Sequence, residues 1–382
     1  MKGLANRRQK QFRELKARIK ATPLVDLGKS GLRIPNGNRI LAKVEYDRNC
    51  HPTGSHYDRV FLRLIELHEK GLAKTPSGKP LPPITPKDTH LIEVSTGNAG
   101  AAFAWAGNQL EYATTVIVPD GLPKKRLDDA RKNGANIEIA ERRNYLNGAI
   151  GRLKELLGTE DKTGKRYVSI NHPFHFETTL EMARIVGETF EEENGIDVVI
   201  FAIGNGSSLL GPAIEFKKRN DDGLVIGWEP FSSGMTFDKF CRTNQTPNYE
   251  QRFGVGIGFA DHTLIGANGN GAPISFAEIA IERGLLDEIQ LVSDDEQYQA
   301  YLSMIKENGF NGLLLLDSVI NMVSNLPEWK STQKLLHELG FPVGRTSAAS
   351  TAVALELADG RSNRKLKDKT ILVIFYDSIE KY

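Results

Sequence analysis

The segment GNGSSLLG, which begins at Gly204, has the residue types that bind a phosphate group. It directly follows the apolar run DVVIFAI, and its small residues let backbone N–H groups approach an anion closely. Ser207 and Ser208 add hydroxyl donors where the next helix is expected to begin. We therefore expect Gly204, Gly206, Ser207 and Ser208 to form a phosphate-binding loop. A tight strand-to-helix turn without a ligand explains the same glycines equally well.

The segment STGNAG, which begins at Ser95, is a second loop of this kind. The loop offers hydroxyl, amide and backbone N–H groups that can donate to a carboxylate or a phenolate. These groups belong to Thr96, Gly97, Asn98, Ala99 and Gly100. A third loop carries Thr346 and Ser347 where another helix is expected to begin. There the hydroxyls either cap the helix or bind a ligand, and for an isolated Thr-Ser pair we favour capping.

The elements around these loops follow the pattern of α/β proteins. Apolar runs typical of buried strands, such as RILAKVEY, TTVIVP and TILVIFYDS, alternate with helical stretches from Gly37 onward. This alternation predicts parallel sheets covered by helices, in which ligands bind outside the carboxyl ends of the strands. The apolar segment at residues 311–323 fits either a strand or a buried helix.

The overall composition favours a small-molecule ligand over nucleic acid or a membrane. The 49 basic and 48 acidic side chains leave a net charge of +1, which creates no field to attract a polyanion. Cys50 and Cys241 lack the spacing of a zinc site or a disulfide framework, which indicates a reducing cytoplasm. No run approaches the ~20 apolar residues of a membrane helix, and no apolar signal core follows the first residues.

Residues 1–20 are rich in lysine and arginine, with Phe12, Leu15 and Ile19 near helical spacing. An organelle transit peptide or a partner-binding helix would have this composition. A basic surface helix docked on the body of the protein explains it better, and we expect that structure.

Taken together and in this order, the loops resemble those of the fold-type II pyridoxal-phosphate enzymes. This family includes cysteine synthase, cystathionine β-synthase, threonine synthase and the tryptophan synthase β chain. The matching segments are TPLVDL, AKVEY, PTGSHYDR, STGNAG, GNGSSLLG, IGWEP, VGRTSAAS and YDSIEKY, which run from Thr22 to the end of the chain. Among these enzymes, cysteine synthase has the most similar motifs. Because the matches are collinear, they specify the fold far better than any one of them does.

The resemblance implies roles for these loops. The phosphate of pyridoxal 5'-phosphate would be cradled by Gly204, Asn205, Gly206, Ser207 and Ser208. Asn98 matches the asparagine that bonds the ring oxygen of the cofactor, and the substrate carboxylate would be gripped by Thr96, Gly97 and Ala99. Ala99 departs from the threonine usual in cysteine synthases. Thr346 matches the residue that faces the pyridine nitrogen, a neutral partner associated with β-elimination and β-replacement.

The resemblance also implies the architecture. It predicts a two-lobed α/β protein in which each lobe is a mostly parallel sheet covered by helices. A large lobe would comprise residues 1–46 and 150–382, and a small mobile lobe residues 47–149. The family further implies a homodimer with an amino acid as its small-molecule ligand, and neither nucleic acid nor a membrane as a partner.

Tyr57 stands where the family carries its essential lysine. The family signature resembles PTGSHKDR, and its lysine forms the Schiff base with the cofactor and then moves the α proton. A phenol cannot form an imine, and its unperturbed pKa near 10 makes it a poor base at neutral pH. His56 precedes Tyr57 and is either a base or a structural residue. Lys43 matches a second lysine of the family, and we expect it to have a structural or electrostatic role.

The remaining histidines suggest no metal site, and we take His172 and His175 as structural.

Two functions stay open. The first is a cysteine synthase-like enzyme that binds pyridoxal phosphate noncovalently, or already condensed with an amino acid, and uses Tyr57 or His56 to move the proton. The second is a non-catalytic ligand-binding or regulatory paralogue that lost the Schiff-base lysine. A variant in which the lysine has been replaced is a third explanation of the same sequence.

Overall fold

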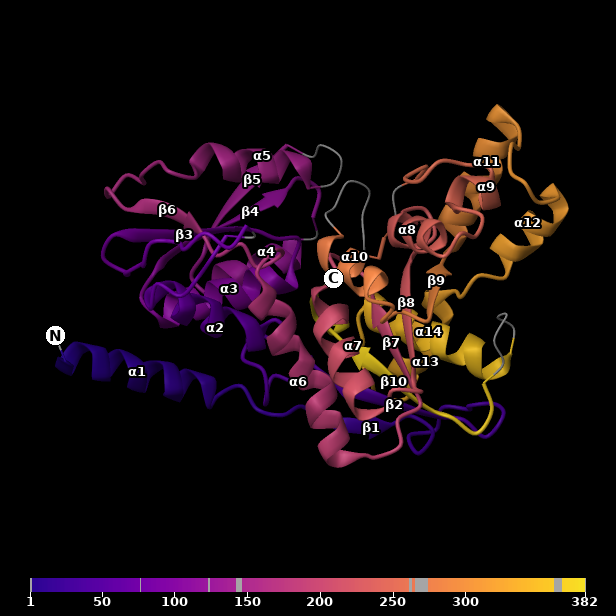
Figure 1. Ribbon diagram of the computed structural model, residues 1–382, viewed down its shortest axis with the longest axis horizontal. Helices are drawn as coiled ribbons and strands as arrows, with labels where there is room; N and C mark the ends of the chain where they lie inside the picture. Colours follow the sequence, from indigo (N-terminus) through magenta and orange to yellow (C-terminus); the bar gives the residue numbers. More distant parts are fainter. Residues whose placement is uncertain are drawn as a thin grey trace. The chain divides into compact units, whose positions relative to one another are not determined.

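The computed structural model describes residues 2–75, 77–122, 124–141, 146–260, 263–264, 274–360 and 366–381. The chain forms two compact units (Figure 1). Unit 1 comprises Met1–Pro23, Glu45–Met182 and Tyr376–Tyr382, and unit 2 comprises Leu24–Val44 and Ala183–Phe375. The two lobes expected from the sequence have other boundaries, and that division stays a prediction.

Unit 2 is built on a six-stranded sheet with the order β1-β2-β10-β7-β8-β9. Its strands are β1 (Leu24–Asp26), β2 (Arg39–Val44), β7 (Val198–Ala202), β8 (Leu224–Pro230), β9 (Glu288–Val292) and β10 (Thr370–Phe375). Only β1 runs antiparallel to its neighbour; the other pairings are parallel. All five residues of β7 are buried, which is why this strand is a continuous apolar run in the sequence.

The helices of unit 2 follow the strands in the alternating pattern expected from the sequence. They are α7 (Ser207–Arg219), α8 (Met235–Thr243), α9 (Tyr249–Phe253), α10 (Ser275–Glu282), α11 (Asp295–Asn308), α12 (Leu316–Ser324), α13 (Trp329–Glu338) and α14 (Arg345–Asp359). Helix α6 (Phe176–Glu192) contributes residues to both units. The ambiguous segment at residues 311–323 is therefore helical in its second half. It is not a buried helix, because Val319 and Val323 are the only buried residues of α12, and Leu313 and Leu315 before it are 69% and 79% exposed.

Unit 1 contains a four-stranded, all-parallel sheet with the order β5-β4-β3-β6. Its strands are β3 (Thr89–Val94), β4 (Ala113–Pro119), β5 (Asn136–Ala140) and β6 (Arg166–Ser169). Its further elements are α2 (Asp58–Glu69), α3 (Asn98–Gln109), α4 (Lys124–Lys132), α5 (Asn147–Leu156) and the short helix η1 (Ile379–Lys381). Figure 1 shows α5 on one face of this sheet and α2, α3 and α4 on the other.

Small residues let α3 pack closely on this sheet. A Cβ atom on Gly107 would lie 2.3 Å from Cγ2 of Thr114 on β4, so a larger residue would push the helix away.

The basic N-terminal segment is helix α1 (Lys2–Lys16), and it docks on unit 1. Its residues Phe12 and Leu15 are buried. Nη2 of Arg8 donates to the carbonyl oxygen of Leu110 at 2.9 Å, and Lys16 pairs with Glu66 of α2. This is the docked surface helix that the sequence favours.

The predicted fold class is confirmed, since both units are parallel-dominated sheets covered by helices. Within the described part of the chain, the helices are all too short or too polar to cross a membrane.

Candidate functional site

The loop at residues 204–208 of unit 2 joins β7 to α7, as the sequence predicts. Gly206 has a φ of 88°, and a Cβ atom there would lie 2.1 Å from the backbone nitrogen of Ala277, so only glycine fits. The carbonyl oxygen of Asn205 accepts a hydrogen bond from Phe276 N at 3.0 Å, which ties the loop to α10. The loop is thus held rigidly at the positive end of the α7 dipole, a setting that suits a phosphate.

Thr346 lies within the first turn of α14, where it is 5% exposed. The helix is capped by the backbone of Gly344, without a side-chain cap. The expectation that Thr346 and Ser347 cap the helix is therefore wrong, because the N-cap position lies two residues before Thr346. Nε1 of Trp228 on β8 donates to Oγ of Ser350 at 2.9 Å and anchors α14 to the sheet.

The loop at residues 95–98 of unit 1 joins β3 to α3. Oγ of Ser95 accepts hydrogen bonds from the backbone nitrogens of Gly97 at 3.2 Å and Gly100 at 2.8 Å. Nδ2 of Asn98 donates to Oδ2 of Asp377 at 3.2 Å. Oδ1 of Asn98 is buried and has no hydrogen-bond partner among the described residues. Asn98 therefore has an acceptor to offer a ligand hydroxyl, which fits the ring oxygen of pyridoxal phosphate in its hydroxyl form.

Arg126 and Asp377 form a buried ion pair behind this loop, with 3.2 Å between Nη2 and Oδ2. Nη1 of Arg126 also donates to the carbonyl oxygen of Thr96 at 3.4 Å. A Cβ atom on Gly97 would lie 2.4 Å from that nitrogen, so glycine is required for the guanidinium to approach. Neither Arg126 nor Asp377 is among the site residues predicted from the sequence, although Asp377 lies in the matching segment YDSIEKY.

Tyr57 is half-buried in unit 1, at the position before α2. The turn that leads to it is fixed by Asp58, whose carboxylate accepts from Thr53 N at 2.7 Å and Thr53 Oγ1 at 2.6 Å. Behind this turn, Glu45 accepts from Arg59 Nε at 2.9 Å. Burial alone would raise the pKa of Glu45, but the charges of Arg59 and His51 hold it at about 2. This buried charged network fixes the backbone that presents Tyr57.

His56 packs against Tyr57 with their ring centres 4.4 Å apart, and against Tyr376 at 5.0 Å. Burial lowers the pKa of His56 to about 3, and the nearby Glu45 carboxylate offsets this only in part. The ring is therefore neutral at physiological pH and holds a proton poorly. These surroundings favour a structural role for His56.

His172 is the other histidine beside Tyr57, with ring centres 5.7 Å apart and ring planes at 89°. Its Nδ1 lies 2.7 Å from Oε1 of Glu93. Glu93 is near the end of β3 and His172 follows β6, and these two strands are neighbours. His172 is predicted from the sequence to be structural, and Glu93 is not among the predicted site residues. The available signal was that both residues lie near the carboxyl ends of predicted strands.

Lys43 lies on β2 in unit 2 with a fully buried side chain, and its Nζ is 2.8 Å from Oε1 of Glu192. Glu188 is a second carboxylate within 3.9 Å of the same nitrogen. Both carboxylates pair with this amine inside unit 2. The structure thus supports the electrostatic role expected for Lys43.

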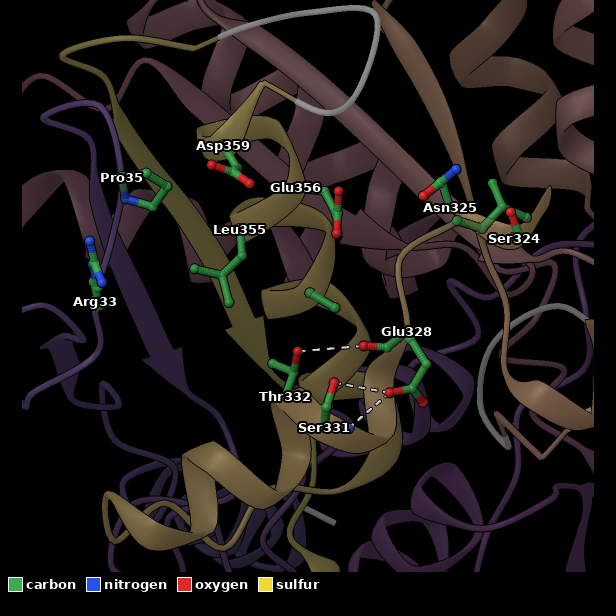
Figure 2. A pocket seen from close by; sticks show the side chains of 12 residues that line it. Arg33, Pro35, Ser324, Asn325, Glu328, Ser331, Thr332, Leu355, Glu356 and Asp359 are labelled. Carbon is green, nitrogen blue, oxygen red and sulfur yellow. Dashed lines mark hydrogen bonds between the residues drawn. The ribbon is translucent and has the colours of Figure 1, made fainter. Parts of the chain in front are cut away.

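Unit 2 also has a polar hollow of about 580 Å³ (Figure 2). Its lining includes Arg33, Asn325, Glu328, Glu356 and Asp359. The Glu328 carboxylate accepts from the backbone nitrogens at the start of α13, which is a capping role. The lining includes none of the residues predicted for the site, so this hollow adds nothing to the chemistry above.

Comparisons with known proteins agree with these features. A protein-family model described as "Pyridoxal-phosphate dependent enzyme" matches residues 15–312. Cysteine synthase A of Escherichia coli is 26% identical over 381 residues, which cover 98% of this chain and 94% of that protein. Cysteine synthase of Buchnera aphidicola is 25% identical over 372 residues, which cover 94% of this chain and 91% of that protein.

Solved structures share the fold. The O-acetylserine dependent cystathionine β-synthase from Helicobacter pylori has a TM-score of 0.66 at 21% identity, with 96% of both chains covered. Cysteine synthase from Entamoeba histolytica also has a TM-score of 0.66 at 21% identity, covering 96% of this chain and 88% of that one.

Proposed function

Because the chain belongs to the family of pyridoxal-phosphate dependent enzymes, we propose that it binds pyridoxal 5'-phosphate noncovalently and acts on an amino acid by β-elimination or β-replacement. The observation that carries the proposal is the Asn98 amide, whose buried oxygen has no partner among the described residues. Similarity to cysteine synthases over nearly the whole chain supports the reaction class. The substrate would be an amino acid with a leaving group on Cβ, such as a serine or cysteine derivative.

Each unit contributes its own residues to this proposal. In unit 2, the loop formed by Gly204, Asn205, Gly206, Ser207 and Ser208 would hold the phosphate, because rigid N–H groups at a helix start bind anions without reorganisation. Thr346, buried in the first turn of α14, would face the pyridine nitrogen as a neutral partner. A neutral partner leaves that nitrogen largely unprotonated.

In unit 1, Asn98 would bond the ring oxygen, and Thr96, Gly97 and Ala99 would bind the substrate carboxylate. Pyridoxal phosphate, when bound, supplies the electron-accepting ring that weakens the bonds at the substrate Cα. Tyr57 would move the α proton in place of the lysine. The phenol at position 57 and the two carboxylates that pair with the Lys43 amine support noncovalent binding.

A titration with pyridoxal phosphate, followed by borohydride reduction and mass mapping, tests the binding mode. We expect reversible binding without a labelled lysine in the unmodified protein, because the anchoring amine is absent. Tyr57→Lys should gain a label at position 57, and Tyr57→Phe is the matched control that should gain none. No binding of pyridoxal phosphate, or a lysine labelled in the unmodified protein, would refute the proposal.

A non-catalytic ligand-binding or regulatory paralogue is the second candidate, and Tyr57 and Ala99 favour it. Two groups that serve catalysis or binding in cysteine synthases are altered, while the rigid phosphate loop is intact. Steady turnover of an amino acid that disappears in Tyr57→Phe would exclude this candidate.

We also propose that the protein is a homodimer of the cytoplasm. Its free cysteines, Cys50 and Cys241, support a reducing compartment. The mass in solution, measured by light scattering, tests the oligomeric state.

A further inference from the structure

We propose that His172, held by Glu93, accepts the phenol proton of Tyr57, so that Tyr57 can act as the base that the family's lysine otherwise provides. The inference rests on the proposed function, and it assigns a partner to Tyr57 within unit 1. His172 is a positioning residue here, because it acts on the substrate only through Tyr57.

Glu93 fixes the orientation of the imidazole. Its side chain is 2% exposed, and Oε1 lies 2.7 Å from Nδ1 of His172. Oε2 accepts hydrogen bonds from Ser169 Oγ at 3.1 Å and Asn171 N at 3.0 Å. A carboxylate with both oxygens engaged in this way cannot turn away from the ring. It also selects the tautomer in which Nδ1 carries the hydrogen, and this leaves the basic lone pair on Nε2.

The imidazole ring stands edge to face beside the Tyr57 ring, at 5.7 Å between centres and 89° between planes. Phe61 packs on the same imidazole with ring centres 5.2 Å apart. The ring is therefore confined between a carboxylate on one edge and two aromatic side chains. The Tyr57 ring thus packs against an imidazole that a carboxylate orients, and a base oriented by a third group is the recurring means of activating a hydroxyl.

Other groups near Tyr57 suit this task less well. His56 also touches Tyr57, but its neutral, deeply buried ring holds a proton poorly. Among the described residues, Glu93 on β3 and Tyr57 before α2 contact His172, and His68 on α2 interacts with Glu93 and His175. Burial lowers the pKa values of His68 and His175, so both rings stay neutral near physiological pH. Glu93 is thus the charged neighbour that can balance an imidazolium at His172.

The proton balance closes without any added reagent. The phenol proton of Tyr57 passes to Nε2 of His172, and the phenolate oxygen takes the α proton of the substrate. The electron pair of the broken C–H bond stays with the substrate, Tyr57 is again a neutral phenol, and the imidazolium faces the Glu93 carboxylate. The reverse transfers return the proton to the product.

Nitrogen NMR of histidine-labelled protein without added cofactor tests the pair directly. We expect the His172 resonances, assigned from their absence in His172→Gln, to report the tautomer with hydrogen on Nδ1. Tyr57→Phe should shift the Nε2 resonance, and Glu93→Gln should shift that of Nδ1. His90→Gln is the matched control and should move neither. Hydrogen on Nε2, or an Nε2 resonance insensitive to Tyr57→Phe, overturns the inference.

Exchange of the substrate α proton in heavy water, with pyridoxal phosphate and L-serine derivatives present, tests the role. General-base assistance contributes about 100-fold or more, so His172→Gln should slow exchange by that factor and remove one ionisation from its pH profile. The His90→Gln variant should exchange the α proton at a rate within about twofold of the unmodified protein, because His90 takes no part in the proposed proton transfer. In a Tyr57→Lys background the His172→Gln change should lose its effect, because the amine then serves as base.

The two proposals fail in different ways. Absence of pyridoxal phosphate binding in the unmodified protein sinks the proposed function, while the NMR of the unloaded protein still decides whether His172 and Tyr57 are coupled. A folded His172→Gln variant that still binds pyridoxal phosphate could also keep the α-proton exchange rate and its pH profile. That result would overturn the His172 inference alone.

Discussion

Strand β3 of unit 1 contributes one residue to each of two histidine–carboxylate pairs. Comparison of the two pairs shows how position along the strand decides whether such a pair is structural or functional. At the start of β3, Nδ1 of His90 lies 2.7 Å from Oδ2 of Asp161. Near the end of β3, Oε1 of Glu93 lies 2.7 Å from Nδ1 of His172. The distances are equal, so the hydrogen bond itself does not distinguish the two sites.

The other neighbours of the two rings distinguish them. Nε2 of His90 lies 2.9 Å from Oγ1 of Thr115 on β4, so both nitrogens of His90 serve to join strands and loops. The His172 ring instead packs against the aromatic rings of Tyr57 and Phe61. The carboxyl end of a parallel sheet is where ligands bind, and only the Glu93 pair lies there. We infer that the pair at the amino end is structural and the pair at the carboxyl end is functional.

Replacement of Glu93 should produce the largest loss of stability among the pair residues. Glu93→Gln leaves a buried amide facing donors from Ser169, Asn171 and His172. Loss of charged, buried hydrogen bonds of this kind costs about 3 kcal/mol of unfolding free energy. Urea denaturation at neutral pH measures it.

Glu177→Gln is the control for this prediction, because Glu177 pairs with Arg63 at a partly exposed position. An exposed pair contributes about 0.5 kcal/mol. If Glu93→Gln costs no more than the control, the two ends of β3 do not differ in the way we describe.

His56 tests whether the carboxylate partner matters. Its ring also lies beside Tyr57, but its buried Nδ1 has no hydrogen-bond partner among the described residues. Burial lowers its pKa in the folded protein to about 3, against about 6.5 when unfolded. Between these values the unfolded chain binds more protons, so stability is complete above about pH 6.5 and falls as the pH decreases toward 3. His56 should contribute a loss of about 2 kcal/mol between pH 7 and pH 5.

Urea denaturation at the two pH values measures this slope, and His56→Gln should flatten it. A slope that persists in His56→Gln would show that other groups cause the acid sensitivity.

The parallel strands and the loops that follow them could be predicted from the sequence because their signals are local. Strand β7 is a continuous apolar run since both faces of the sheet are covered, and Gly206 follows it at once. Helix α12 marks the limit of this reasoning. Its apolar stretch is long enough for a buried element, yet only Val319 and Val323 of the helix are buried, and Leu313 and Leu315 before it are exposed. Periodicity within a short apolar run did not reveal which side chains face solvent.

The Glu93–His172 pair could not be predicted in the same way, because its members are 79 residues apart. They meet only because β3 pairs with β6 in a register that sets Ile92 opposite Ser169. Order along the chain does not determine which strands become neighbours in a parallel sheet. The ion pair of Arg126 with Asp377 was missed for the same reason, since its members are 251 residues apart.

The smallest effect is expected at the amino end of β3. Burial alone would raise the pKa of Asp161, but hydrogen bonds from His90, Thr163 and Lys165 lower it. A lowered pKa stabilises the fold above the unfolded value near 4, and this stability is lost as the pH falls below it. Asp161→Asn should therefore cost about 1 kcal/mol at pH 7, as for a partly screened pair, and less near pH 3.

Denaturation at the two pH values measures the cost of Asp161→Asn, and α-proton exchange measured in parallel should stay within about twofold of the unmodified protein. That separation is the sharpest form of the comparison, because the same kind of hydrogen bond is removed at each end of one strand. Loss of exchange in Asp161→Asn would mean that the amino-end pair reaches the chemistry through β3. Position at the carboxyl end would then no longer explain why Glu93 and His172 serve Tyr57.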